Sequence, residues 1–155
     1  MALLLKTLLR AQGFDARQTD IGTDDVPYSP QQVPTIAAID HAICTVYHQG
    51  KAYFLDATNP YIPMGYIPAN IQGRQALVEK ESGCDVVTLP VLSEEANSSS
   101  EVMEGSLITL DNGTYAMKGN VTSSWSGDMK AMVMSAYESV AKDEKDRLLA
   151  RILGL

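Results

Sequence analysis

A hairpin signal centred on Gln49-Gly50 constrains the fold of this chain more than any other feature. Residues 40–48 (DHAICTVYH) and 51–57 (KAYFLDA) are rich in β-forming side chains and flank this dipeptide. Two such runs around a short turn that contains glycine are typical of antiparallel strands. The sequence therefore predicts a hairpin whose register is set by this turn.

This register places His41 and Asp56 on the same face of the hairpin. It sets Ile43 opposite Asp56, and Ile43 shares a face with His41 because side chains alternate along a strand. His41 and Asp56 are therefore diagonal neighbours with backbones about 7 to 8 Å apart, a gap that an imidazole and a carboxylate can bridge. Cys44 lies an odd number of residues from His41, so it points to the opposite face and is predicted to be a small buried hydrophobic residue.

The pair His41 and Asp56 has two interpretations. In the catalytic one, Asp56 accepts a hydrogen bond from one ring nitrogen of His41, which leaves the other nitrogen free to take a proton from a nucleophile. In the structural one, the two side chains are a half-buried polar pair, and Asp56 caps the turn that starts at Thr58. Spacing alone does not decide between them.

The rest of the first half predicts one helix and three more strands. Residues 1–12 are predicted to form a buried helix that packs against a sheet and ends near Gly13. Its apolar face consists of Leu3, Leu4, Leu8 and Ala11, widened by Leu5 and Leu9. The strands are predicted at 15–23, 73–80 and 85–90, and the proline-rich segments 24–35 and 59–68 are predicted to be irregular.

The polar segment 93–101 (SEEANSSSE) divides the chain. We expect a first domain over residues 1–92, a linker over 93–101 and a small α+β accessory domain over 102–155. In the accessory domain, Asp111-Asn112-Gly113 predicts a second hairpin. Helices are predicted at 128–140 and 143–153, with Trp125 and the methionines Met129, Met132 and Met134 in the core. The predicted fold class is α+β.

Composition excludes several classes of function. The chain has 12 Lys and Arg against 19 Asp and Glu and no basic cluster, so nucleic acid and anionic membrane are not expected partners. Lys6 and Arg10 interrupt the first apolar run, so the chain shows no targeting signal and no membrane insertion. No CxxC or HExxH spacing is present, and neither a metal site nor a cofactor site is expected. A bridge between Cys44 and Cys84 stays open.

Two segments together resemble a known family. ALLLKTLLRAQGFDAR and IDHAICTVYHQGKAYFLDATNPYIPMGYIPANIQGRQAL are similar to the transglutaminase-like (papain-like) core of bacterial cell-envelope proteins. In that family an Asn or Asp precedes the catalytic His, and a strand ends in Leu-Asp-Ala-Thr. A Pro- and Tyr-rich loop then closes with Gln-Gly-Arg. The resemblance covers residues 1 to about 78, and the order of these motifs is its most specific part.

The resemblance implies catalytic roles for His41 as the base and Asp56 as the orienting acid. The family's nucleophilic Cys begins the central helix in a Gly-Asp-Cys-Lys-Asp stretch, where the helix N-terminus favours the thiolate. That stretch leads into an Ala-Leu-Leu-Leu segment like residues 2–5, so Met1 falls just after the expected position of the Cys. We therefore expect an N-terminally truncated core fragment that lacks the nucleophile and is inactive as given. Residues 102–155 resemble part of the small domain that often follows this core.

For the intact parent, the resemblance implies acyl transfer on a protein or peptide substrate in the periplasm or cell envelope. The acceptor, water in a protease or an amine in a transglutaminase, stays open. Surfaces exposed by truncation are expected to favour a homo-oligomer. The alternative is a non-catalytic binding or scaffold module that presents an aromatic surface built from Tyr47, Tyr53, Tyr61 and Tyr66.

Overall fold

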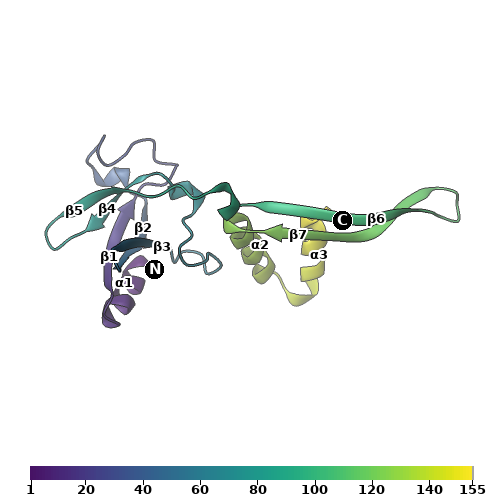
Figure 1. Cartoon of the computed structure of the whole chain (residues 1–155), viewed down its shortest axis with the longest axis horizontal. Helices are drawn as coiled ribbons and strands as arrows, with labels where there is room; N and C mark the ends of the chain where they lie inside the picture. The colour runs from purple at the N-terminus through teal and green to yellow at the C-terminus, as the bar shows by residue number, and fades with distance from the viewer. Residues whose placement is uncertain (155) are drawn as a thin grey trace. The chain divides into compact units, whose positions relative to one another are not determined.

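The computed structural model describes residues 1–154 and divides them into two compact units. The first unit is Met1–Ala96, and the second begins at Asn97. Helices and antiparallel strands occur in both units, so the α+β class is confirmed (Figure 1).

The first unit is a curled antiparallel sheet of five strands with one helix. In space the strand order is β3-β2-β1-β4-β5. The strands are β1 (Asp15–Ile21), β2 (His41–His48), β3 (Lys51–Leu55), β4 (Gln75–Glu79) and β5 (Cys84–Thr88). The helix is α1 (Ala2–Ala11), and three short 3-10 turns are η1 (Ile36–Ala38), η2 (Ala69–Ile71) and η3 (Glu94–Ala96). All predicted strands of this half are confirmed, with ends that differ by a few residues.

Both faces of this sheet are packed. On one face, the main core consists of Ile21, Ile43, Ile67, Ile71, Ala76 and Leu89. On the other face, Leu5 and Leu9 of α1 pack against a smaller cluster of Ala16, Cys44 and Val46. One face of β2 therefore points toward the irregular segments, and the other points toward α1.

The expectation that α1 is a buried helix is wrong. Leu3, Leu4 and Leu8 are exposed, and no residue of the helix is fully buried. The cause lies far along the chain, because the Glu79 carboxylate on β4 binds both Lys6, at 3.0 Å, and Arg10, at 3.4 Å. These ion pairs fix which side of the helix meets the sheet, and most of the leucine stripe turns away from it.

The second unit consists of a long β-ribbon and two helices. The strands β6 (Ser99–Thr109) and β7 (Tyr115–Trp125) pair along their whole length around the predicted Asp-Asn-Gly turn. The helices are α2 (Gly127–Ser139) and α3 (Lys145–Ile152), joined by the 3-10 turn η4 (Lys142–Glu144). This hairpin and both helices confirm the predicted elements. Within the predicted linker 93–101, however, β6 already begins at Ser99.

The methionines of α2 depart from the expected core packing. Met129 and Met132 are exposed, whereas Ala131 and Val133 are buried. The helix thus turns its small and β-branched side chains inward. Met134 and Trp125 are half-buried.

Candidate functional site

The β2–β3 hairpin has the register that its turn predicts. Cys44 is paired with Leu55, and His48 is paired with Lys51 across the turn. Gln49 and Gly50 both have positive φ, at 50° and 75°. This left-handed pair matches the twist of the two strands and holds the register.

His41 and Asp56 meet at the open end of this hairpin. The imidazole Nε2 donates to Asp56 Oδ2 over 2.8 Å. The side chain of Asp56 is only 6 % exposed, and that of His41 is 22 % exposed. The other carboxylate oxygen of Asp56 accepts from the backbone N–H of Thr58 at 2.9 Å. The carboxylate is therefore held from both sides, and it fixes the plane of the ring.

The pair shifts the pKa of both members. The hydrogen bond to Asp56 raises the pKa of His41 above 6.5, although partial burial opposes the shift. Burial alone would raise the pKa of Asp56, but hydrogen bonds from His41 and Thr58 stabilise the carboxylate, and the net effect lowers it. The arrangement thus favours an imidazolium beside a carboxylate.

A second carboxylate anchors the backbone that leads into His41. Asp40 accepts from the backbone N–H of Thr23 at 2.7 Å and from the Thr23 hydroxyl at 2.6 Å. These bonds lower the pKa of Asp40. These bonds therefore join the two ends of the long segment between β1 and β2. Sequence reasoning missed this contact, since nothing around Thr23 marks it as the partner of a residue 17 positions away.

A small apolar pocket of about 280 Å³ lies beside Asp56. Leu5 and Leu9 of α1 and the segment from Ile62 to Tyr66 line it together with Asp56. By strand alternation, however, His41 shares a face with Ile43, the face opposite to α1. The pair is nevertheless connected to α1 through this pocket, because Asp56 lines it together with Leu5 and Leu9 of the helix.

Neither cysteine is placed to act with His41. Cys44 is fully buried on the α1 face, and burial raises the pKa of its thiol. Cys84 lies on β5, three strands away from β2, which is about 14 Å along the sheet. Both cysteines are free thiols.

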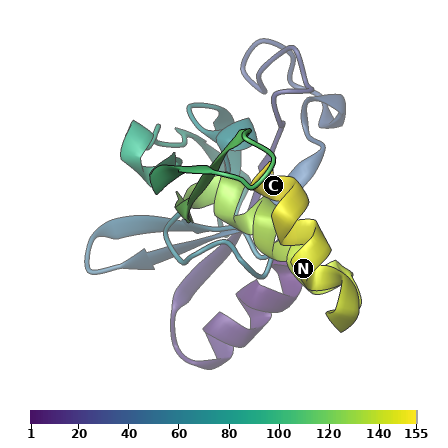
Figure 2. The ribbon, with the colours of Figure 1, turned by 90° about the vertical axis from the view of Figure 1, so that its right-hand side faces the viewer.

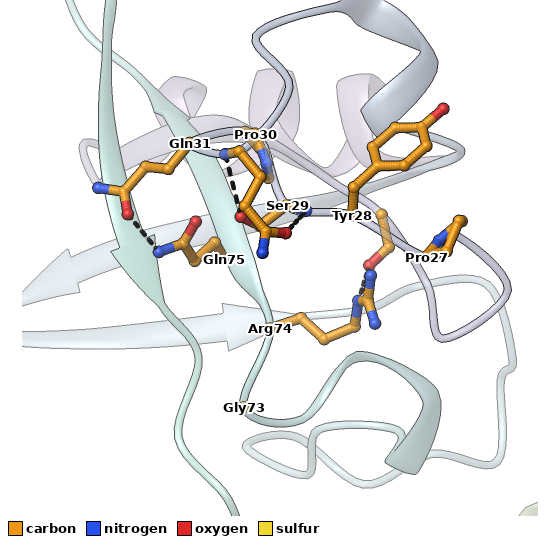
Figure 3. A pocket seen from close by; sticks show the side chains of 10 residues that line it. Pro27, Tyr28, Ser29, Pro30, Gln31, Gly73, Arg74 and Gln75 are labelled. Carbon is orange, nitrogen blue, oxygen red and sulfur yellow. Dashed lines mark hydrogen bonds between the residues drawn. The ribbon is translucent and has the colours of Figure 1, made fainter.

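A larger pocket of about 520 Å³ lies between residues 27–32 and 73–75 (Figure 3). Arg74 supports its wall by donating from Nε to the carbonyl oxygen of Gly22 and from Nη2 to that of Val26. Gln75 Nε2 donates to Gln31 Oε1 at 2.7 Å. Gln75 Oε1 is buried and accepts no hydrogen bond from residues 1–154.

Two further classes of feature are not found in residues 1–154. No group of three or more His, Cys, Asp or Glu side chains is arranged to hold a metal ion in this range. Over the same residues, no helix has the length and apolar character needed to cross a bilayer.

Comparisons of the chain with protein-family models, with curated proteins and with solved structures found no match.

Proposed function

We propose that His41 and Asp56 are the base and the orienting acid of a transglutaminase-like centre for acyl transfer through a cysteine thiolate. The observation that carries the proposal is the 2.8 Å hydrogen bond from His41 Nε2 to a nearly buried carboxylate. The resemblance of residues 1–78 to the papain-like core supports the same roles. In this proposal the centre acts on a protein or peptide in the cell envelope.

The hydrogen bond supports a base rather than a purely structural histidine. With Nε2 bound to Asp56, the neutral ring carries its lone pair on Nδ1, and Nδ1 makes no hydrogen bond within residues 1–154. A thiol proton accepted at Nδ1 would form an imidazolium that Asp56 stabilises. The thiolate sulfur would then attack an amide carbonyl, and the imidazolium would return the proton to the departing amine.

The nucleophile is neither Cys44 nor Cys84. Cys44 is buried behind the sheet, and Cys84 is on the far strand. We therefore expect this chain alone to show no turnover of an amide substrate. Whether the acyl group passes to water or to an amine depends on the acceptor that reaches the thioester.

The proposal can be tested by supplying the thiol. A variant with Gly-Asp-Cys-Lys-Asp joined ahead of Ala2, with Cys44→Ser and Cys84→Ser, carries a single cysteine at the start of α1. We expect iodoacetamide to alkylate this thiol well below the pH at which a free cysteine reacts, because His41 and the helix N-terminus favour the thiolate. The readout is the rate of alkylation against pH, followed by mass spectrometry.

The matched controls are His41→Ala and Asp56→Asn in the same background. Each should move the midpoint of the alkylation profile toward that of an ordinary cysteine, near pH 8.5. A profile that does not change when His41 is removed would refute the assigned role of this histidine, provided that circular dichroism shows the variant to be folded.

A second candidate is a non-catalytic binding module, favoured by the buried, unpaired Gln75 Oε1 in the larger pocket. An acceptor of this kind suits the N–H group of a peptide backbone. The predicted tyrosine surface does not support this candidate, because Tyr47 and Tyr53 lie on opposite faces of the hairpin and Tyr66 is buried.

Triglycine should shift the amide signals of residues 73–75 in the native chain and leave them unchanged in Gln75→Leu. Equal shifts in both would exclude Gln75 as the acceptor.

A further inference from the structure

The β6–β7 ribbon carries an apolar face that is open to solvent. Its register pairs Leu107 with Met117 and Thr109 with Tyr115, so their side chains lie on one face. Leu107 and Tyr115 are each 70 % exposed, and Met117 is 66 % exposed. Met103, on the same face, is 55 % exposed. Two strands without a packed face are marginally stable in water, so this ribbon requires a cover.

The helices of the same unit cover only the base of this face. Val121, Ser123 and Trp125 are half-buried, whereas the residues between them on the opposite face are exposed. Both α2 and α3 lie on one side of the ribbon, and its turn end extends beyond them (Figure 1 and Figure 2). The apolar face therefore continues past the helices without a partner from its own unit.

From Met103 to the turn, this face carries no charge on either strand, and Glu101, on the same face nearer the helices, accepts a hydrogen bond from Ser123. Glu104 is paired with Asn120, and Lys118 is paired with Ser106. Glu104 and Ser106 each lie an odd number of residues from Leu107, so both pairs point to the opposite face. The chain has a net charge of −7, so two copies repel each other over most of their surface. The uncharged face is where this repulsion is smallest.

The relief of the face is complementary to itself. Gly105 is paired with Gly119, so the ribbon has no side chains there and forms a shallow trough. The row formed by Leu107 and Met117 stands next to the trough as a ridge. A face with a ridge beside a trough fits a second copy of itself about a two-fold axis, because each ridge enters the other trough.

We propose that this face of the ribbon is a homodimer interface, occupied by the same face of a second copy. An interface built mainly from four exposed side chains per copy is small, and we expect it to bury about 1,000 Å² in total, the lower limit for a specific interface. The expected dimer is consequently weak and concentration-dependent. The ribbon itself requires glycine at position 119, since a Cβ there would collide with the carbonyl oxygen of Glu104 and with Cα of Gly105 on the facing strand.

The test is the molar mass of the full chain in solution. Size-exclusion chromatography with light scattering, at loading concentrations of about 10 to 200 µM, covers the range expected for such an interface. We expect the mass to rise toward twice 16.8 kDa across this range. A constant monomer mass at every concentration would overturn the proposal.

Two substitutions on neighbouring residues form a matched pair. Leu107→Glu adds a charge to the ridge, and Ser106→Glu adds the same charge to the opposite face, beside Lys118. We expect Leu107→Glu to be monomeric at every concentration and Ser106→Glu to dimerise like the native chain. If both variants dimerise equally, the interface lies elsewhere.

A charge-swap experiment guards against a variant that simply unfolds. Leu107→Lys alone should also be monomeric, but an equimolar mixture of Leu107→Lys and Leu107→Glu should recover part of the dimer, because opposite charges meet across the two-fold axis. Unfolded ribbons would not be rescued by mixing. Absence of any heterodimer, with both variants showing native circular dichroism, would contradict the stacked arrangement.

Discussion

Two buried hydroxyl groups show how narrowly the interior of the first unit is specified. Thr19 on β1 and Thr45 on β2 are both fully buried, and their Oγ1 atoms are hydrogen-bonded to each other. A hydroxyl group that loses its partner in such a place incurs a desolvation penalty. Each of the two hydroxyl groups therefore depends on the other for its hydrogen bond.

We predict that Thr45→Val destabilises the first unit by about 1 to 3 kcal/mol, because it strands the Thr19 hydroxyl. Chemical denaturation followed by circular dichroism measures the change. The double variant Thr19→Val with Thr45→Val should recover most of the loss, since no polar group is then left unpaired. A double variant that loses as much as the sum of the single changes would contradict this reasoning.

The His41–Asp56 pair makes stability depend on pH. The pKa of His41 is raised in the folded state, so its contribution is complete below pH 6.5 and is lost as pH rises through the raised value. The pKa of Asp56 is lowered, so its contribution is present above 3.8 and is lost as pH falls through the lowered value. The pair therefore stabilises most between about pH 4 and 6.5.

Asp56→Asn should lower the free energy of unfolding by about 1 to 2 kcal/mol in that window, and by less above it. The measurement is urea unfolding at several pH values. His41→Gln should lower the free energy of unfolding by the same amount, because either change breaks the pair. Its difference from the native chain should also become smaller above pH 6.5. A difference from the native chain that stays constant from pH 5 to 9 would argue against a titrating pair.

Sequence reasoning reached this pair because both partners lie on one local hairpin. The turn set the register of β2 and β3, and this register brought the two side chains together at the open end of the hairpin. The contacts of Asp40 with Thr23 and of Glu79 with Lys6 could not be predicted from the sequence, since each joins segments that only the folded sheet brings together. The predicted catalytic roles of His41 and Asp56 remain predictions.

At the level of elements, the side chain of Arg74 holds the middle of the segment between β1 and β2. Arg74 donates to the carbonyl oxygens of both Gly22 and Val26, and this fork holds the segment over β4. A lysine has the same charge but not the planar fork, so it cannot satisfy both carbonyl groups in this geometry. The segment should loosen without Arg74.

We predict that Arg74→Lys increases amide hydrogen exchange in residues 22–35 and destabilises the unit by about 1 to 3 kcal/mol. Exchange followed by mass spectrometry resolves this segment from the rest of the sheet. Arg17→Lys is the comparison, because Arg17 makes its ion pair with the exposed Asp15 and should matter little. Equal exchange in the native chain and Arg74→Lys would show that the fork does not hold the segment.

Elements with local signals were predictable, and their burial was not. Both turns, Gln49-Gly50 and Asp111-Asn112-Gly113, join strands as predicted. The leucine stripe of α1 predicted a helix correctly but indicated the wrong burial, since periodicity does not reveal which side an ion pair from β4 selects. The same applies to Met129 and Met132 of α2.

For the whole molecule, the division at Ala96 and Asn97 has a direct consequence. The core of the first unit is built only from residues 1–96, because all members of its two hydrophobic clusters lie there. A domain with its own core folds independently. The first unit should therefore not need the ribbon or its helices.

We predict that residues 1–96 alone fold, with amide chemical shifts that match those of the same residues in the full chain. Heteronuclear NMR spectra of the two proteins provide the comparison. Shift changes confined to the last few residues agree with independent units. A collapsed spectrum for residues 1–96 would show that the first core requires the second unit.

The most direct test of the central claim is the titration of the His41 ring by NMR in the native chain and in Asp56→Asn. We predict a pKa above 6.5 that falls when Asp56 is replaced, and a neutral ring with its proton on Nε2, as the 2.8 Å hydrogen bond requires. An unchanged pKa in Asp56→Asn, or a neutral ring protonated on Nδ1, would contradict the oriented base on which the proposed function rests.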